Sequence, residues 1–107
     1  FLESLKTDLE LHQVFVFTPA GEVKVLPARA TPLDFAFAVH TDIGMACVGA
    51  KVNNKMVKFD YELQSGDICE IVVKKGSLPK KDWLNHVRTA RARSKIRHYL
   101  REKGIVV

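Results

Sequence analysis

The sequence has no apolar run that approaches the roughly 20 residues a helix needs to cross a bilayer. Its first residues, FLESLKTDLELHQ, have neither the basic start nor the apolar middle of a secretory signal. The 107 residues suffice for one core of modest size but not for two ordinary enzyme domains. We therefore expect a cytoplasmic protein with one domain and an appendage.

Cysteine is scarce. The chain has two, Cys47 and Cys69, which is too few for a disulfide-rich framework. Neither belongs to a CxxC motif or has a second cysteine or a histidine at metal-ligand spacing. We expect both to be reduced core residues, and we expect no metal site in this chain.

Catalytic motifs are missing as well. The sequence contains no glycine-rich phosphate loop, GxSxG, HExxH or His-Asp pair, and its histidines are scattered. We predict no catalytic residue here. Because the sequence begins at Phe1 rather than Met, we also expect a fragment of a longer protein.

The positive charge is confined to the C-terminal part. Residues 1–78 carry 8 Lys or Arg against 10 Asp or Glu, whereas residues 79–107 carry 9 against 2. Such a segment suits a polyanion, and its arginines favour RNA because guanidinium groups contact phosphates and stack on bases; the alternative is an ordinary solvated helix. The cations predicted to contact RNA are Arg88, Arg91, Arg93, Lys95 and Arg97.

The N-terminal half predicts a hairpin followed by a helix. The pattern of residues 14–17 and 23–25 predicts two strands joined by a turn. Residues 14–17 are apolar on both faces, as in a strand that is covered on both sides or central in a sheet. Thr31 and Asp34 then predict the start of a helix over about residues 32–40. Phe35 and Val39 lie on the side opposite Leu33, so one side would pack on the sheet and leave the other for docking a partner.

His40 falls at the end of this helix, where two roles are open. The imidazole could bind a phosphate or an unpaired base at the rim of the sheet. Alternatively, it could hydrogen-bond carbonyls at the helix C-terminus.

Three more strands are expected within residues 47–73. The order strand, strand, helix, strand, strand, strand predicts an α+β fold, a ubiquitin-like β-grasp with a mixed sheet wrapped on one helix. A basic helical extension follows, and its two apolar stripes favour a break near residues 90–94. We predict the end of a preceding helix over 1–12, the β-grasp domain over 13–75 and the start of a helical domain over 76–107.

Four stretches together resemble a known family. They are VFVFTPAGEVKVLPARATPLDFAFAVHTDIG, CVGAKVNNKMV, LQSGDICEIV and DWLNHVRTARARSKIR. In this succession, over about residues 14–101, the chain closely resembles the TGS domain and adjoining helical segment of long Rel/SpoT-type (p)ppGpp synthetase/hydrolases. TGS domains also occur in threonyl-tRNA synthetase and some GTPases, and the last stretch is the one that indicates the Rel/SpoT branch.

The resemblance implies a β-grasp fold and a regulatory, non-catalytic role in the stringent response. Catalysis in this family belongs to preceding hydrolase and synthetase domains, which use Mn²⁺ and Mg²⁺ and are absent from this chain. The histidine of the family's HTDIG motif contacts the CCA end of uncharged tRNA on the ribosome, and His40 is the matching residue.

Two other hypotheses for the function stay open beside tRNA sensing. In a SpoT-like protein the domain would bind acyl carrier protein or the catalytic domains of its own polypeptide, with Phe35 and Val39 as docking residues. In the other hypothesis the chain is a structural spacer.

Overall fold

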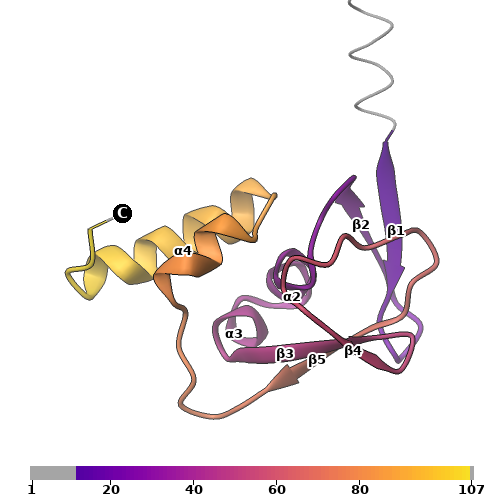
Figure 1. The fold of residues 1–107 in the computed structure, drawn as a ribbon, viewed down its shortest axis with the longest axis horizontal. Helices are drawn as coiled ribbons and strands as arrows, with labels where there is room; N and C mark the ends of the chain where they lie inside the picture. Colours follow the sequence, from indigo (N-terminus) through magenta and orange to yellow (C-terminus); the bar gives the residue numbers. More distant parts are fainter. Residues whose placement is uncertain (1–11, 107) are drawn as a thin grey trace, which may run out of the picture.

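The computed structural model describes residues 12–106, so the predicted preceding helix lies almost wholly outside the described residues. Along the chain the elements are β1 (Gln13–Phe17), β2 (Val23–Pro27), α2 (Pro32–Val39), α3 (Thr41–Met45), β3 (Cys47–Val52), β4 (Lys55–Val57), β5 (Cys69–Val73), the 3₁₀ helix η1 (Lys81–Asn85) and α4 (Ala90–Glu102) (Figure 1). This order confirms the predicted α+β, β-grasp architecture with a helical extension. No helix within residues 12–106 is long and apolar enough to span a membrane.

The strands form two antiparallel sheets that meet at β1. One pairs β1 with β2, and the other has the order β4-β3-β5. The junction is parallel: Phe17 N–H donates to the Asp67 carbonyl at 2.9 Å, and Phe17 bridges to Ile68. The predicted mixed sheet therefore arises at a short parallel contact rather than along a whole strand.

The outer face of β1 is open, contrary to the expectation of a strand covered on both sides. Val16 is fully buried, but the side chain of Phe15 is 48% exposed. Within the plane of the sheet β1 is nevertheless central, because β2 pairs with one of its edges and residues 66–68 bond to the other. Alternate side chains of a strand point to opposite faces, and only one face of this hairpin meets the core.

Helix α2 packs between two apolar clusters. Phe35 belongs to the cluster on the strands, with Val16 and Cys69 among its members. Leu33 and Phe37 belong to a second cluster, whose other members come mainly from η1, α4 and the segment between them. Figure 1 shows α2 between the strands and α4 accordingly.

The second cluster explains why both sides of α2 are apolar. Elements η1 and α4 cover the side of Leu33 and Phe37, and the strands cover the side of Phe35, which is only 1% exposed. The prediction of Phe35 as a docking residue at the surface is therefore wrong.

The C-terminal arm, defined here as residues 79–106, has the predicted break. The break occupies residues 86–89, slightly before the predicted position, because Thr89 accepts a hydrogen bond from Ala92 N–H and caps α4. The change of direction lets Trp83 and Val87 join Ile96 in one cluster. The two apolar stripes of the arm, one before the break and one after it, thus pack into the same cluster.

Candidate nucleic-acid interface

His40 lies between α2 and α3 with its imidazole at the surface. Its backbone is extended, and the ring nitrogen Nδ1 accepts a hydrogen bond from Asp42 N–H at 3.0 Å, so the ring caps the start of α3 rather than the end of α2. The side chain is 62% exposed. With Nδ1 as the acceptor, Nε2 carries the proton of the neutral ring and can donate it. The Asp42 carboxylate lies 3.7 Å from Nδ1.

Helix α3, which was not predicted, fixes the position of His40. Its Gly44 lies against the ring of Phe37, so closely that a Cβ atom on Gly44 would lie 2.5 Å from ring carbons. Only glycine permits this approach. The close contact seats α3 on α2 and thereby holds His40 at the junction of the two helices.

The arginines and lysine of the arm lie without acidic partners. Within residues 12–106 none of the predicted RNA-contacting cations has a carboxylate oxygen within 4.0 Å. Arg88 and Arg93 donate instead to backbone carbonyls, Arg93 to that of Val87 at 3.3 Å. Their positive charge is therefore available to an anionic ligand.

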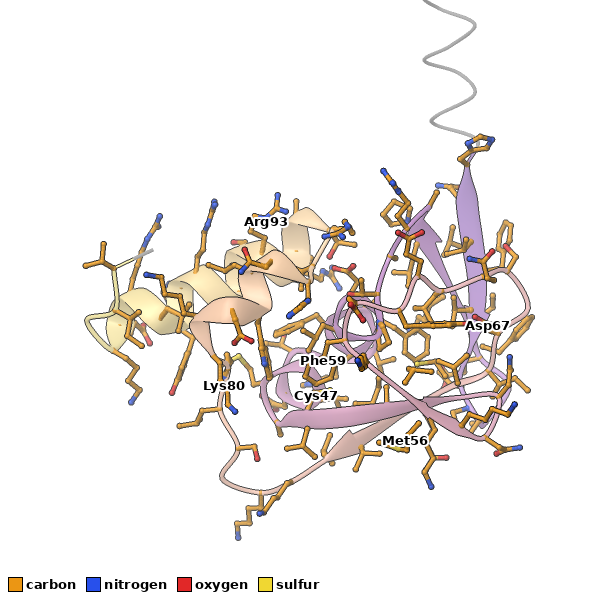
Figure 2. The ribbon with its side chains drawn as sticks, in the orientation of Figure 1. Cys47, Met56, Phe59, Asp67, Lys80 and Arg93 are labelled. Atoms are coloured by element: carbon orange, nitrogen blue, oxygen red, sulfur yellow. The ribbon has the colours of Figure 1, made fainter. Side chains whose placement is uncertain are left out.

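These cations do not share one face of α4. Ala92, Ile96 and Leu100 are fully buried and define the inner face. At 100° per residue, Arg93 and Arg97 follow one flank of that face, whereas Arg91 and Lys95 follow the other. Figure 2 shows Arg93 on the upper side of α4, and Lys80, which precedes η1, below the helix. The predicted interface is therefore split into two rows.

Asp34 joins the start of the arm to α2, a role that the sequence did not reveal. Its carboxylate is 1% exposed and accepts hydrogen bonds from Thr31 N–H at 2.9 Å, Arg88 N–H at 2.9 Å, and both Thr89 N–H and Thr89 Oγ1 at 3.0 Å. Thr31 Oγ1 donates to the His86 carbonyl at 2.7 Å. Asp34 and His40 are six residues apart, so this junction lies about 9 Å along α2 from the imidazole.

The aromatic residues of the arm are engaged internally. Trp83 is buried and meets Phe59 edge to face, with ring centroids 5.8 Å apart. Tyr99 is partly buried, and Lys103 Nζ lies 5.8 Å from its ring centre. Trp83 is thus an anchor of the arm rather than a platform for a base.

Val39 lines an apolar cleft on the other side of α2. The cleft has a volume of about 280 Å³ and also involves Pro19, Ile43 and Val73, with Phe35 beneath. Of the two predicted docking residues, only Val39 is partly exposed. A partner on this surface would therefore contact Val39 together with the more exposed Val73.

The side chains that could ligate a metal are dispersed. Among residues 12–106, no three His, Cys, Asp or Glu side chains come together in a way that could hold a metal ion. Cys47 and Cys69 are free and buried, and burial raises the pKa of their thiols to about 11 and about 12 respectively.

The TGS domain model matches residues 14–73, more than half of the chain. The chain belongs to the TGS domain family.

The curated relatives are Rel/SpoT-type proteins. A GTP pyrophosphokinase from Myxococcus xanthus is 48% identical over 96% of this chain, and the bifunctional (p)ppGpp synthase/hydrolase SpoT of Escherichia coli (strain K12) is 50% identical over 94%. The bifunctional enzyme RelA of Mycobacterium tuberculosis is 45% identical over 92%. In each case the match spans 14% of the relative, so the chain corresponds to about one seventh of these proteins.

A solved structure resembles the chain as well. The crystal structure of a GTP-binding protein from Pyrococcus horikoshii OT3 superimposes with a TM-score of 0.57 and 30% sequence identity. The match covers 67% of this chain and 24% of that protein. It supports the β-grasp fold.

Proposed function

We propose that this chain is the regulatory, RNA-sensing module of a Rel/SpoT-type (p)ppGpp enzyme. In this proposal His40 contacts the CCA end of uncharged tRNA on the ribosome. The observation that carries it is the imidazole at the α2–α3 junction: 62% exposed, oriented by Asp42 N–H, and able to donate from Nε2. A fixed donor of this kind suits contact with an unpaired nucleotide.

The arm supplies the second part of the proposed interface. Its two rows of cations have no carboxylate partners within residues 12–106, which leaves them for RNA phosphates. The Asp34 junction and the shared apolar cluster hold the arm against α2, the helix at whose end His40 lies. RNA bound there would favour one placement of the module relative to the catalytic domains of the longer protein and relieve their inhibition.

The names of the relatives support the chemistry proposed for the parent. They are GTP pyrophosphokinases and (p)ppGpp synthase/hydrolases, and we propose that the longer protein carries one or both of these activities. This chain would contribute regulation only.

Salt-dependent binding tests the role of the arm. If about four phosphates are neutralised, the affinity of the 107-residue chain for deacylated tRNA should fall with a log–log slope near −3. Reversing Arg93 and Arg97 to Glu should weaken binding and flatten the slope, whereas reversal of Lys55, an exposed lysine of β4, is the matched control. Binding that is independent of salt, or equally sensitive to Lys55→Glu, would contradict the proposal.

The apolar cleft at Val39 supports a second candidate, docking of acyl carrier protein or of the parent's catalytic domains. Val39→Asp should then abolish carrier-protein binding, measured by pulldown, and leave tRNA binding unchanged. Loss of tRNA binding alone on reversal of Arg93 and Arg97 would favour the RNA proposal. If neither ligand binds, the chain is a spacer.

A further inference from the structure

Strand β2 has a free edge. It pairs with β1 on one side, and no other strand within residues 12–106 pairs with it. Thr18 N–H donates to the Glu22 carbonyl, and Ala28 N–H donates to the His12 carbonyl. These two bonds show which opposed residues of β1 and β2 are hydrogen-bonded to each other. Alternation then directs the N–H and C=O groups of Val23 and Val25 away from β1.

A cleft runs along this free edge. It has a volume of about 320 Å³ and lies between β2, α2 and the start of α4. Asp34 also lines it, but its carboxylate is already bonded to the N–H groups of Arg88 and Thr89. Figure 1 shows β2 on the side of the hairpin that faces α4. Apolar atoms of Leu26, Pro27 and Ala38 contribute to the lining.

Two cations line the same cleft. Lys24 comes from β2 and Arg91 from α4. Within residues 12–106 neither has a carboxylate oxygen within 4.0 Å. The cleft therefore offers unpaired positive charge next to unpaired backbone groups.

The outer face of the hairpin adds an apolar surface beside the edge. Val25 is 51% exposed and Val23 is 48% exposed. Val25 lies opposite Phe15 on β1, and Val23 lies opposite Phe17. Exposed sheet edges are normally covered or blocked by charge because they invite pairing with another strand. Apolar side chains of an added strand would pack beside Val23 and Val25 on the outer face of the hairpin. Its side chains on the inner face would contact Lys24 and Arg91.

We propose that the edge of β2 is a docking site for an extended, acidic segment of a partner protein, which adds to the sheet as a further strand. The backbone groups of Val23 and Val25 supply the ladder, and Lys24 and Arg91 select acidic side chains on the inner face. A second copy of the chain is a poor occupant, because pairing of two β2 edges would bring Lys24 of each copy together. This site shares Arg91 with the predicted RNA-contacting cations but does not include His40.

The test uses a fluorescent heptapeptide of alternating glutamate and valine, titrated into the 107-residue chain. Saturable binding with shifts of the Val23 and Val25 amide signals in NMR spectra is expected. Val25→Pro removes an outward N–H, leaves the β1–β2 ladder intact and should weaken binding by about tenfold or more, whereas Val25→Thr keeps the N–H and should bind normally. Equal binding by Val25→Pro would overturn the proposal.

The peptide itself provides a test that does not depend on folding of a variant. N-methylation of all valine amides or of all glutamate amides should abolish binding for one of the two peptides only, since alternate amides of an added strand face β2. Loss in both or in neither would contradict strand addition.

Charge variants complete the experiment. Arg91→Glu should weaken peptide binding, and Arg97→Glu, on the other flank of α4, should not. A peptide of alternating lysine and valine should fail to bind. If a single-stranded oligonucleotide occupies the cleft in place of the acidic peptide, or if the chain dimerises through β2, the proposal is wrong. Because tRNA binding is measured separately, this outcome leaves the role of His40 intact.

Discussion

Asp34 is the residue on which the position of the arm depends. Its partners Arg88 and Thr89 are 54 and 55 residues away, and both donate backbone N–H groups to the buried carboxylate. A carboxylate out of water costs free energy unless such donors surround it. Here the donors come from the loop that precedes α4, so satisfying Asp34 requires the arm to be docked.

Replacing Asp34 with Asn tests this role. The amide keeps the shape but turns one acceptor into a donor that faces other N–H groups, so the free energy of unfolding should fall by about 2–4 kcal/mol. Urea denaturation measures the change. Asp60→Asn, at an exposed position, is the control and should stay within about 0.5 kcal/mol of the unmodified chain. Equal stability of the two variants would show that Asp34 does not hold the arm.

The cysteines yield a prediction about pH. Burial raises the pKa of Cys47 to about 11 and of Cys69 to about 12 from 9.0, so the folded state binds these protons more tightly than the unfolded state. Their contribution to stability is complete below pH 9 and declines as pH rises through about 9 to 12. Iodoacetamide at pH 8.5 should label neither thiol in the native chain and both in urea. Rapid native labelling would contradict the burial.

The sequence predicted half of the role of Asp34. The Thr31–Asp34 spacing marks a helix start, and Thr31 N–H does donate to the carboxylate. The bonds to Arg88 and Thr89 have no local signature, because they depend on how a distant segment packs. The burial of Phe35 has no local signature either, because its side of α2 packs on strands that come from both ends of the domain.

At the scale of elements, α2 is the axis around which both clusters are built. The strands cover one side, and the arm covers the other with Ile96 and Leu100. The arm is therefore an integral part of the packed molecule and not a free tail.

Ile96→Ala tests whether the arm is docked in this way. The substitution removes a fully buried side chain and should lower the free energy of unfolding by about 2–4 kcal/mol, with a single cooperative urea transition. Ser94→Ala, on the exposed face of the same helix, should change stability by less than about 0.5 kcal/mol. A negligible effect of Ile96→Ala would mean that the arm is detached in solution.

Element order could be predicted from the sequence, but α3 could not. Turn residues and alternation defined the strands, and two incompatible apolar stripes indicated the break in the arm. Thr41–Met45 is only five residues long and contains a glycine, so it has no detectable period. It is held by His40 and by the contact of Gly44 with Phe37, which are tertiary features.

At the scale of the molecule, two surfaces with different chemistry emerge. One combines an oriented imidazole with two rows of unpaired cations, and the other is a free strand edge beside Lys24; Arg91 lies where the second adjoins the first. Charge counting along the sequence predicted the basic character of the arm. It did not predict the division of the cations between two flanks, because that depends on which face of α4 is buried.

The central claim is that His40 senses whether a tRNA is charged, and comparative binding of deacylated and aminoacylated tRNA tests it most directly. The unmodified chain should prefer deacylated tRNA. His40→Ala should lower this preference by about fivefold, the effect of one lost hydrogen bond, with a smaller change in overall affinity. His12→Ala, which removes another exposed imidazole, should preserve it. An equal loss of affinity for both tRNAs in His40→Ala would contradict the claim.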